Sequence, residues 1–155
     1  MNTQFHMHAP QTLKRLVFTG LAVLVMLAAR AADTQDSKSI QGAWTPLKAE
    51  LGGQPFPAAV LKTISLQLHN GKYDVSVAGE PDRGTYTIDP STKPKSMSVT
   101  GTDGPNKGKT FPAIYELDGD TLKICYDLSG KQRPADFKTT EGTRLYLVTY
   151  QRRKE

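Results

Sequence analysis

The stretch TISLQLHNGKYDVSV, Thr63 to Val77, alternates apolar and polar side chains on both sides of a short turn. The apolar positions are Ile64, Leu66, Leu68, Tyr73, Val75 and Val77. Because successive side chains of a strand face opposite sides of a sheet, this period of two predicts two strands, each with one dry face and one wet face. The Asn70-Gly71 pair between them is a strong hairpin signal. The stretch therefore predicts an antiparallel hairpin that covers a hydrophobic core.

Short β-prone runs of the same kind continue along the chain, separated by turn clusters such as Gly79-Glu80-Pro81-Asp82. We expect strands at 43–51, 63–68, 73–78, 85–88, 95–100, 110–117, 121–126 and 144–151. The last run is apolar on both faces, so it is expected to close the sheet or to meet a neighbour. Only 57–62 is expected to be helical, where it could cover an open end. The pattern predicts an all-β fold: a barrel of about eight antiparallel up-and-down strands with a short helix after the first strand.

The N-terminal segment has the features of a secretory signal peptide. Lys14 and Arg15 precede the apolar run LVFTGLAVLVMLAA, which ends in Ala29-Arg30-Ala31. This run is short of the ~20 apolar residues that span a bilayer, and the A-x-A ending is typical of a cleavage site. We expect a signal peptide at 1–31, a flexible leader at 32–39 and one barrel domain at 40–155. The protein is then exported to the periplasm, cell surface or extracellular space, without a membrane span after cleavage.

The charge balance argues against a nucleic-acid partner. The chain has 20 basic and 15 acidic residues, but three of the basic ones, Lys14, Arg15 and Arg30, leave with the signal peptide. The mature chain is therefore close to neutral, and its basic cluster at 152–154 is typical of a solvated tail.

The stretch GPNKGKT, Gly104 to Thr110, superficially resembles a phosphate-binding loop. The spacing is wrong, because the position five residues before Gly108 is Asp103 rather than glycine, and its carboxylate would repel an anion. The residues that follow are β-prone, not helical. We expect a hairpin connection in which Gly104, Asn106 and Gly108 can take positive φ.

Catalytic and metal-binding patterns are not evident. His69 is the only histidine after residue 31, and with Cys125 it does not form a recognisable zinc pair. The Asp118-Gly119-Asp120 sequence lacks the ligand spacing of a calcium loop and is typical of a hairpin turn. The sequence does not show that the two carboxylates of a pair such as Glu116 and Asp118, or Asp74 and Asp82, lie close together in space. We therefore predict no catalytic residue, metal or cofactor.

Two features have alternative interpretations. Cys125 is either a small apolar filler, which its residue type favours, or a thiol activated by Lys123 on the same face of its strand. The long connection 129–142 is either a binding loop or a packed loop held by Phe137.

Gly42-Ala43-Trp44 in the first expected strand resembles the G-x-W signature of the lipocalins. The resemblance implies that Trp44 packs across the closed end of a barrel beneath an arginine from the last strand, which would be Arg152 or, as second choice, Arg144. The chain is also similar to a family of exported lipocalin-like domains abundant in planctomycete bacteria. The stretches that carry this similarity are IQGAWTPLKAELGGQPFP, GTYTIDPSTKPKSMSVT, TDGPNKGKTFPAIYELDGDTLKICYD and KQRPADF. It implies no particular reaction or ligand.

Three functions remain open at this stage. A barrel of this size can hold one small ligand, and the tyrosines expected to line its mouth are Tyr73, Tyr86, Tyr115, Tyr126 and Tyr146. Alternatively, the domain is a structural or protein-interaction module without an internal ligand, whose protein partners the sequence does not identify. An enzyme would need titratable groups that converge in a cleft, with His69 or Cys125 among them. The partner we expect first is a small hydrophobic or amphipathic molecule.

Overall fold

The structure of the protein, a computed structural model, describes residues 35–154. The predicted signal peptide at 1–31 lies outside these residues. Between residues 35 and 154, no helix is long and apolar enough to cross a membrane.

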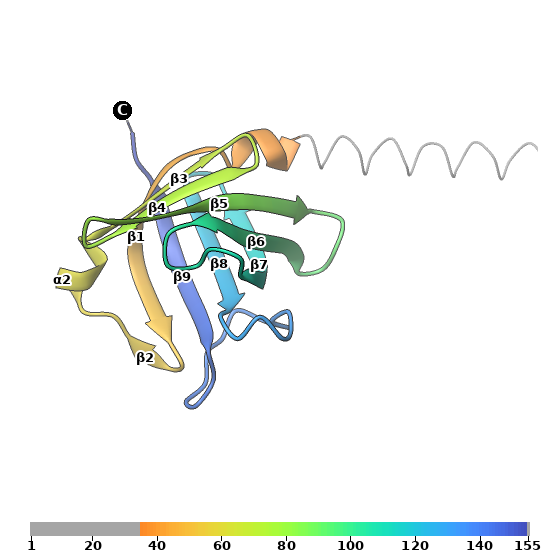
Figure 1. Cartoon of the computed structure of the whole chain (residues 1–155). Helices are drawn as coiled ribbons and strands as arrows, with labels where there is room; N and C mark the ends of the chain where they lie inside the picture. Colours follow the sequence, from red (N-terminus) through yellow and green to blue (C-terminus); the bar gives the residue numbers. More distant parts are fainter. Residues whose placement is uncertain (1–34, 155) are drawn as a thin grey trace, which may run out of the picture. The chain divides into compact units, whose positions relative to one another are not determined.

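A closed antiparallel barrel forms the described part of the chain (Figure 1). Its eight strands are β1 (Gly42–Leu51), β3 (Ile64–His69), β4 (Lys72–Val77), β5 (Glu80–Asp89), β6 (Lys95–Asp103), β7 (Thr110–Asp118), β8 (Thr121–Asp127) and β9 (Leu145–Arg152). Each strand pairs with the next of these, and β9 pairs back with β1 over seven register positions. The predicted up-and-down barrel is therefore confirmed, and the last strand closes it.

Two short elements follow β1. β2 (Gln54–Pro55) pairs with the end of β1, and α2 (Ala58–Leu61) begins after Pro57. Pro57 is the N-cap residue: its backbone is extended, and its main-chain oxygen accepts hydrogen bonds from the N–H groups of Val60 and Leu61. The predicted short helix after the first strand is confirmed, and none of its residues is buried.

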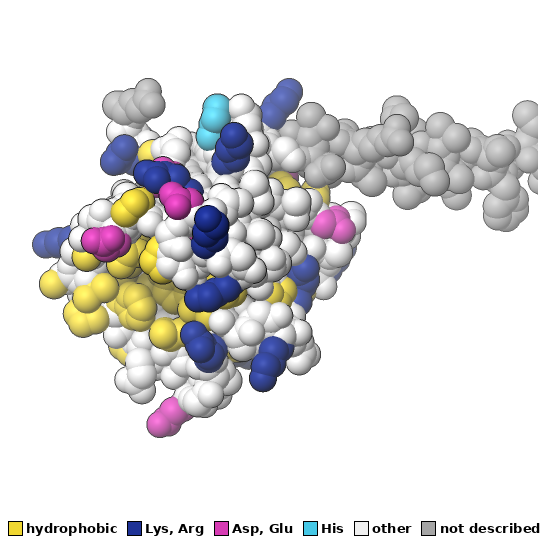
Figure 2. All heavy atoms as spheres, viewed as in Figure 1, with side chains coloured by type: hydrophobic (Ala, Val, Ile, Leu, Met, Phe, Trp, Pro, Cys, Tyr) yellow, Lys and Arg dark blue, Asp and Glu magenta, His cyan; other side chains and the backbone are white. Residues whose placement is uncertain are grey.

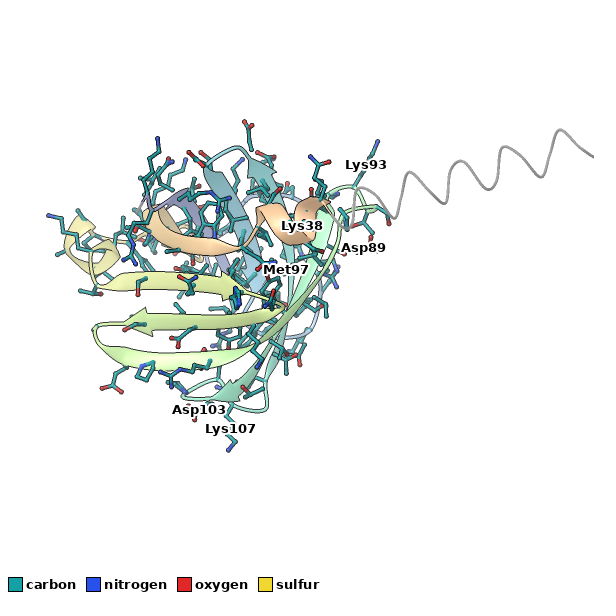
Figure 3. All side chains as sticks on the ribbon, turned by 90° about the horizontal axis from the view of Figure 1, so that it is seen from above. Lys38, Asp89, Lys93, Met97, Asp103 and Lys107 are labelled. Atoms are coloured by element: carbon teal, nitrogen blue, oxygen red, sulfur yellow. The ribbon has the colours of Figure 1, made fainter. Side chains whose placement is uncertain are left out.

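The strand connections alternate between two ends of the barrel. At the open end lie the β1–β3 connection with β2 and α2, and the connections β4–β5, β6–β7 and β8–β9. At the closed end lie the other hairpin turns, the first residues of β1 and the last of β9. In Figure 3, Asp89 and Lys93 lie at the closed end and Asp103 and Lys107 at the opposite end, with Met97 between them.

The core is the inner face of the barrel. The alternation that predicts the hairpin at 63–77 corresponds to observed burial: Ile64, Leu66, Leu68 and Tyr73 are buried, and Val75 packs against them. The register agrees, since β3 pairs with β4 throughout and the turn residue Asn70 has φ 48°, as a tight hairpin requires.

Strand β5 is longer than predicted. The expected turn cluster 79–82 is wrong, because the chain turns at Ala78 and Gly79, both with positive φ, and Glu80, Pro81 and Asp82 already belong to the strand. β6 likewise extends through Asp103, into the stretch predicted as a loop. As a result, Asp82 occupies a position on the inner face of the barrel.

The stretch predicted as a flexible leader also differs. Residues 35–39 are helical, and the Asp36 carboxylate accepts hydrogen bonds from the Tyr115 hydroxyl (2.7 Å) and the Lys95 ammonium (2.6 Å). Ile40, which follows, is fully buried in the core. These side-chain contacts join residues 36 and 40 to the barrel, so the boundary expected at residue 40 is too late.

Candidate functional site

The interior of the barrel contains a cavity of about 260 Å³ that reaches the open end. Its lining is predominantly apolar and includes residues of β1 and of β3 to β9, with Phe56 beyond β2. At the rim of the open end, the lining residues Leu51 and Val77 are exposed, and so is Val60 in α2, which contacts β1. Figure 2 shows hydrophobic side chains gathered on the surface beside α2 and β2. The apolar surface of the cavity is thus continuous with an apolar rim.

One wall of the cavity is aromatic. The Tyr146 ring lies between Phe56 and Tyr126, with ring centroids 5.6 and 5.8 Å apart, respectively. Tyr150 lies deeper on the same strand as Tyr146 and also lines the cavity. Burial raises the pKa of Tyr146 to about 12, and it also raises the pKa values of Tyr126 and Tyr150. All three phenols are therefore neutral at physiological pH, with flat apolar faces and hydroxyl groups that can form hydrogen bonds.

The opposite wall carries a polar cluster of Asp82, Tyr73 and Asn106. The Tyr73 hydroxyl donates to Oδ2 of Asp82 (3.1 Å), and the Asn106 side chain donates to the same oxygen (3.0 Å). The main-chain N–H of Asn106 donates to Oδ1 (3.1 Å). Burial raises the pKa of Tyr73, and the charge and hydrogen bond of Asp82 raise it further. The result is a carboxylate held in a fixed orientation in a predominantly apolar cavity.

A glycine gives this cluster its geometry. Gly84 lies two residues after Asp82 on the inner face of β5, opposite Tyr73 on β4. A Cβ atom there would lie 2.6 Å from the Tyr73 ring and 2.0 Å from the main-chain oxygen of Thr100. The absence of a side chain at Gly84 therefore lets the Tyr73 ring pack against β5, with its hydroxyl at Asp82.

The loop that superficially resembles a phosphate-binding motif contributes to this wall. It connects β6 and β7 as a hairpin, as we expected because its glycine spacing does not fit a phosphate-binding loop. Gly104 and Gly108 have positive φ as predicted, whereas Asn106 does not. Its contribution to the cavity is Asn106, through the two hydrogen bonds to Asp82.

Four of the five tyrosines expected at the cavity line it, namely Tyr73, Tyr86, Tyr126 and Tyr146. The placement of Tyr115 is wrong: its ring is buried in the core, its hydroxyl binds Asp36, and it borders a separate hollow with Lys95 and Phe137. Sequence reasoning missed Tyr150, Asp82 and Asn106. Alternation could have found Tyr150, which shares a face with Tyr146, but Asp82 was assigned to a turn.

The closed end is filled by Trp44. Its ring is 1% exposed, and its Nε1–H donates to the main-chain oxygen of Ile40 (3.0 Å). The Arg152 guanidinium lies 4.2 Å from the Trp44 ring centroid and donates to the main-chain oxygens of Gln41 and Ser39, both at 2.6 Å. Gly42 has φ 132°, and a Cβ atom there would lie 2.8 Å from the Arg152 guanidinium. This is the arrangement that the resemblance implies.

Arg144, the second choice for the arginine above Trp44, does not lie at the closed end of the barrel. Arg144 precedes β9 at the open end, where its main-chain oxygen accepts a hydrogen bond from Leu128. Arg152 instead pairs in register with Trp44, and its Nε also donates to Asp120 (3.1 Å) in the β7–β8 turn.

The loop 129–142 packs against the outside of the barrel. The Arg133 guanidinium donates to the main-chain oxygens of Met97 and Ala113, and Lys123 lies over the Phe137 ring (5.1 Å to its centroid). Thr139 donates to Glu50 in β1 (2.7 Å). These contacts agree with the interpretation of a packed loop.

Cys125 lies beneath this loop. It alternates with the inward-facing Ile124 and Tyr126, so it faces outward, yet it is 0% exposed, and its Sγ lies 3.9 Å from the main-chain oxygen of Lys138. Burial, followed by the nearby carboxylates, raises the pKa of its thiol to about 11. These observations agree with the interpretation of an apolar filler rather than an activated thiol.

The other titratable residues considered from sequence do not converge. Asp74 is on the outer face, where it pairs with Arg83 (2.6 Å), whereas Asp82 faces inward. Glu116 pairs with Lys123, and His69 contacts the neighbouring Asn70 side chain. Within residues 35–154, no three His, Cys, Asp or Glu side chains are placed to hold a metal ion.

Comparisons with known proteins add little to this description. No protein-family model matches the chain, and a search of curated proteins finds no match. Among solved structures, the chain is similar to a DUF4847 family protein from Bacteroides vulgatus, with 13% sequence identity and a TM-score of 0.47. The match covers 77% of this chain and 98% of that one. A likeness this weak does not identify a family, so the fold rests on the strand pairing described above.

Proposed function

We propose that this protein is an exported, lipocalin-like binding module that holds a small hydrophobic or amphipathic molecule inside the barrel. The observation that carries the proposal is the cavity of about 260 Å³. Ligand sites are typically concave and apolar, with a few placed polar groups. Here the apolar lining, the tyrosine hydroxyls and the Asp82 cluster have that composition.

The two ends of the barrel support the same function. At the closed end, Trp44 and Arg152 block passage, so a ligand would enter only from the open end. Leu51 and Val77 line the cavity at the open-end termini of β1 and β4, and their exposed side chains offer an apolar path into it. The size fits a single small ligand, as expected for an eight-stranded barrel.

The same rim supports a second candidate, a protein-interaction module without an internal ligand. Exposed apolar side chains that cluster on a surface are a feature of interaction sites. The two candidates differ in where an apolar molecule would bind, which is inside the barrel for the first and on the rim for the second.

Val99→Trp tests the first candidate by filling the cavity. Val99 lines the cavity from β6, and a larger side chain there would occupy part of the space. We expect the affinity for the neutral fluorescent probe N-phenyl-1-naphthylamine to fall at least about tenfold, a loss of ~1.4 kcal/mol. The measurement is a titration of probe fluorescence at constant protein concentration.

The matched control is Gln67→Trp, which adds the same side chain at an exposed, outward position of β3. It should leave probe affinity unchanged. Equal binding by wild type, V99W and Q67W would place the probe outside the cavity and favour the interaction module. Circular dichroism of each variant verifies that the barrel is intact.

Export and a natural ligand are tested together by native mass spectrometry of the protein purified from its host's envelope. We expect a chain that begins after Ala31 and carries a co-purified small molecule. An uncleaved chain would contradict export. A cleaved but empty chain would favour the interaction module.

A further inference from the structure

We infer that Asp82 selects ligands with a cationic amine, so that the natural ligand is a small amphipathic amine whose apolar part lies against the aromatic wall. This inference rests on the proposed function and specifies its ligand class. It comes from three features of the cavity: the buried position of Asp82, the absence of an ion pair to it within residues 35–154, and the free acceptor position on its Oδ1.

Asp82 is a carboxylate in a predominantly apolar cavity. It is only 8% exposed, its register partner on β4 is Val75, and the lining of the same cavity includes Val99 and Phe111. Burial of an ionised carboxylate costs free energy unless hydrogen bonds and an opposite charge compensate it. Asp82 has the hydrogen bonds described above, but within residues 35–154 no ion pair includes it; the adjacent Arg83 faces outward and pairs with Asp74 and Asp103.

The hydrogen bonds leave one acceptor position unused. A carboxylate has about four lone-pair positions. Two donors, Tyr73 and the Asn106 side chain, contact Oδ2, whereas one, the Asn106 main chain, contacts Oδ1. Oδ1 can therefore accept one further hydrogen bond, and a ligand ammonium would provide both that donor and the missing positive charge.

The rest of the cavity suits the other part of such a ligand. Tyr126, Tyr146 and Tyr150 offer ring faces, and an ammonium close to a ring face is also stabilised by cation–π attraction. An anionic head group would instead lie against the Asp82 charge in a poorly solvated cavity. The same surface should therefore favour amines and disfavour carboxylates.

The test uses three molecules with one alkyl chain and different head groups: decylamine, decanol and decanoate. Each is titrated at pH 7 against N-phenyl-1-naphthylamine bound to the protein, below its aggregation concentration. We expect decylamine to displace the probe at a concentration at least about tenfold lower than decanoate, with decanol between them. In Asp82→Asn this preference should disappear: the concentrations at which decylamine and decanoate displace the probe should come to lie within about twofold of each other, because decylamine loses affinity relative to decanol.

The control is Asp103→Asn, which removes the same charge from an exposed site at the open end. It should retain the preference for decylamine. Equal displacement by decylamine and decanoate in the wild type would overturn the inference, and so would an equal loss for all three molecules in D82N, because Asp82 would then act only by holding Asn106. Failure of the neutral probe to bind the wild type would contradict the proposed function itself.

Discussion

Replacement of Trp44 by alanine is expected to lower the free energy of unfolding by about 3–5 kcal/mol, the usual range for loss of a large buried aromatic side chain. The reason is that one ring fills the closed end. Its removal leaves a void in the core, removes the stacking partner of Arg152 and loses the hydrogen bond to Ile40. Urea or guanidinium unfolding, followed by circular dichroism, measures the change.

Trp44→Phe separates the volume of the ring from its hydrogen bond. It keeps much of the packing but has no N–H, so an intermediate loss is expected, and it serves if Trp44→Ala does not fold. Leu47→Ala is the control, since Leu47 is on the same strand but 57% exposed, and it should change stability by less than about 0.5 kcal/mol. A loss below about 1 kcal/mol in W44A would show that the closed end tolerates a void.

The alternation of apolar and polar residues decides how much of the barrel can be predicted from the sequence. It reports the face of a strand, so Ile64, Leu66 and Leu68 were correctly assigned to the core. It does not report height along the barrel. Tyr115 does face inward, as Phe111 and Ala113 do, but β7 runs from the open end to the closed end, so residue 115 lies too far along the strand to reach the cavity.

Asp82 was missed for a different physical reason. Alanine rarely adopts positive φ, so Ala78-Gly79 is a weaker turn signal than the following Gly79-Glu80-Pro81-Asp82 cluster. In the structure Ala78 has φ 52°, and the tight turn moves Asp82 into β5 with its side chain inward. Pro81 is tolerated near the start of that strand. The most chemically distinctive residue of the cavity was therefore hidden by local turn preferences.

The outer loop was unpredictable because its contacts are not periodic. Asp127, the last residue of β8, is only 6% exposed. Its two oxygens accept hydrogen bonds from the main-chain N–H groups of Ser129, Lys131 and Gln132 and from the Ser129 hydroxyl, at 2.6–3.1 Å. One carboxylate thus sets the first turn of the loop 129–142, and this loop covers Cys125.

Asp127→Ala is expected to lower the free energy of unfolding by about 2–4 kcal/mol, because it removes the four hydrogen bonds through which a buried carboxylate holds the first turn of the loop. If the first turn of the loop is lost, the cover over Cys125 loosens. In the wild type the thiol is buried and its pKa is raised to about 11, so it should react slowly with a disulfide reagent such as 5,5′-dithiobis(2-nitrobenzoate). In D127A the reaction should be at least about tenfold faster.

The contribution of Asp127 to stability should decrease in acid. Burial alone would raise the pKa of Asp127, but the hydrogen bonds from Ser129, Gln132 and Lys131 outweigh it and lower the pKa. A carboxyl group whose pKa is lower in the folded state stabilises the fold above its unfolded value of ~4, and this contribution is lost as the pH falls through the folded pKa. Wild type and D127A should therefore become more similar in stability in acid.

Asp89→Ala is the matched control. Asp89 accepts hydrogen bonds from the N–H and hydroxyl of Ser91 in the same local pattern, but its turn is exposed and lies at the other end of the barrel. D89A should have a much smaller effect on stability and none on thiol reactivity. If D127A were destabilised while Cys125 stayed unreactive, the loop would be held by Arg133 and Phe137 rather than by its first turn. Fast labelling of the wild type would instead contradict the burial of Cys125.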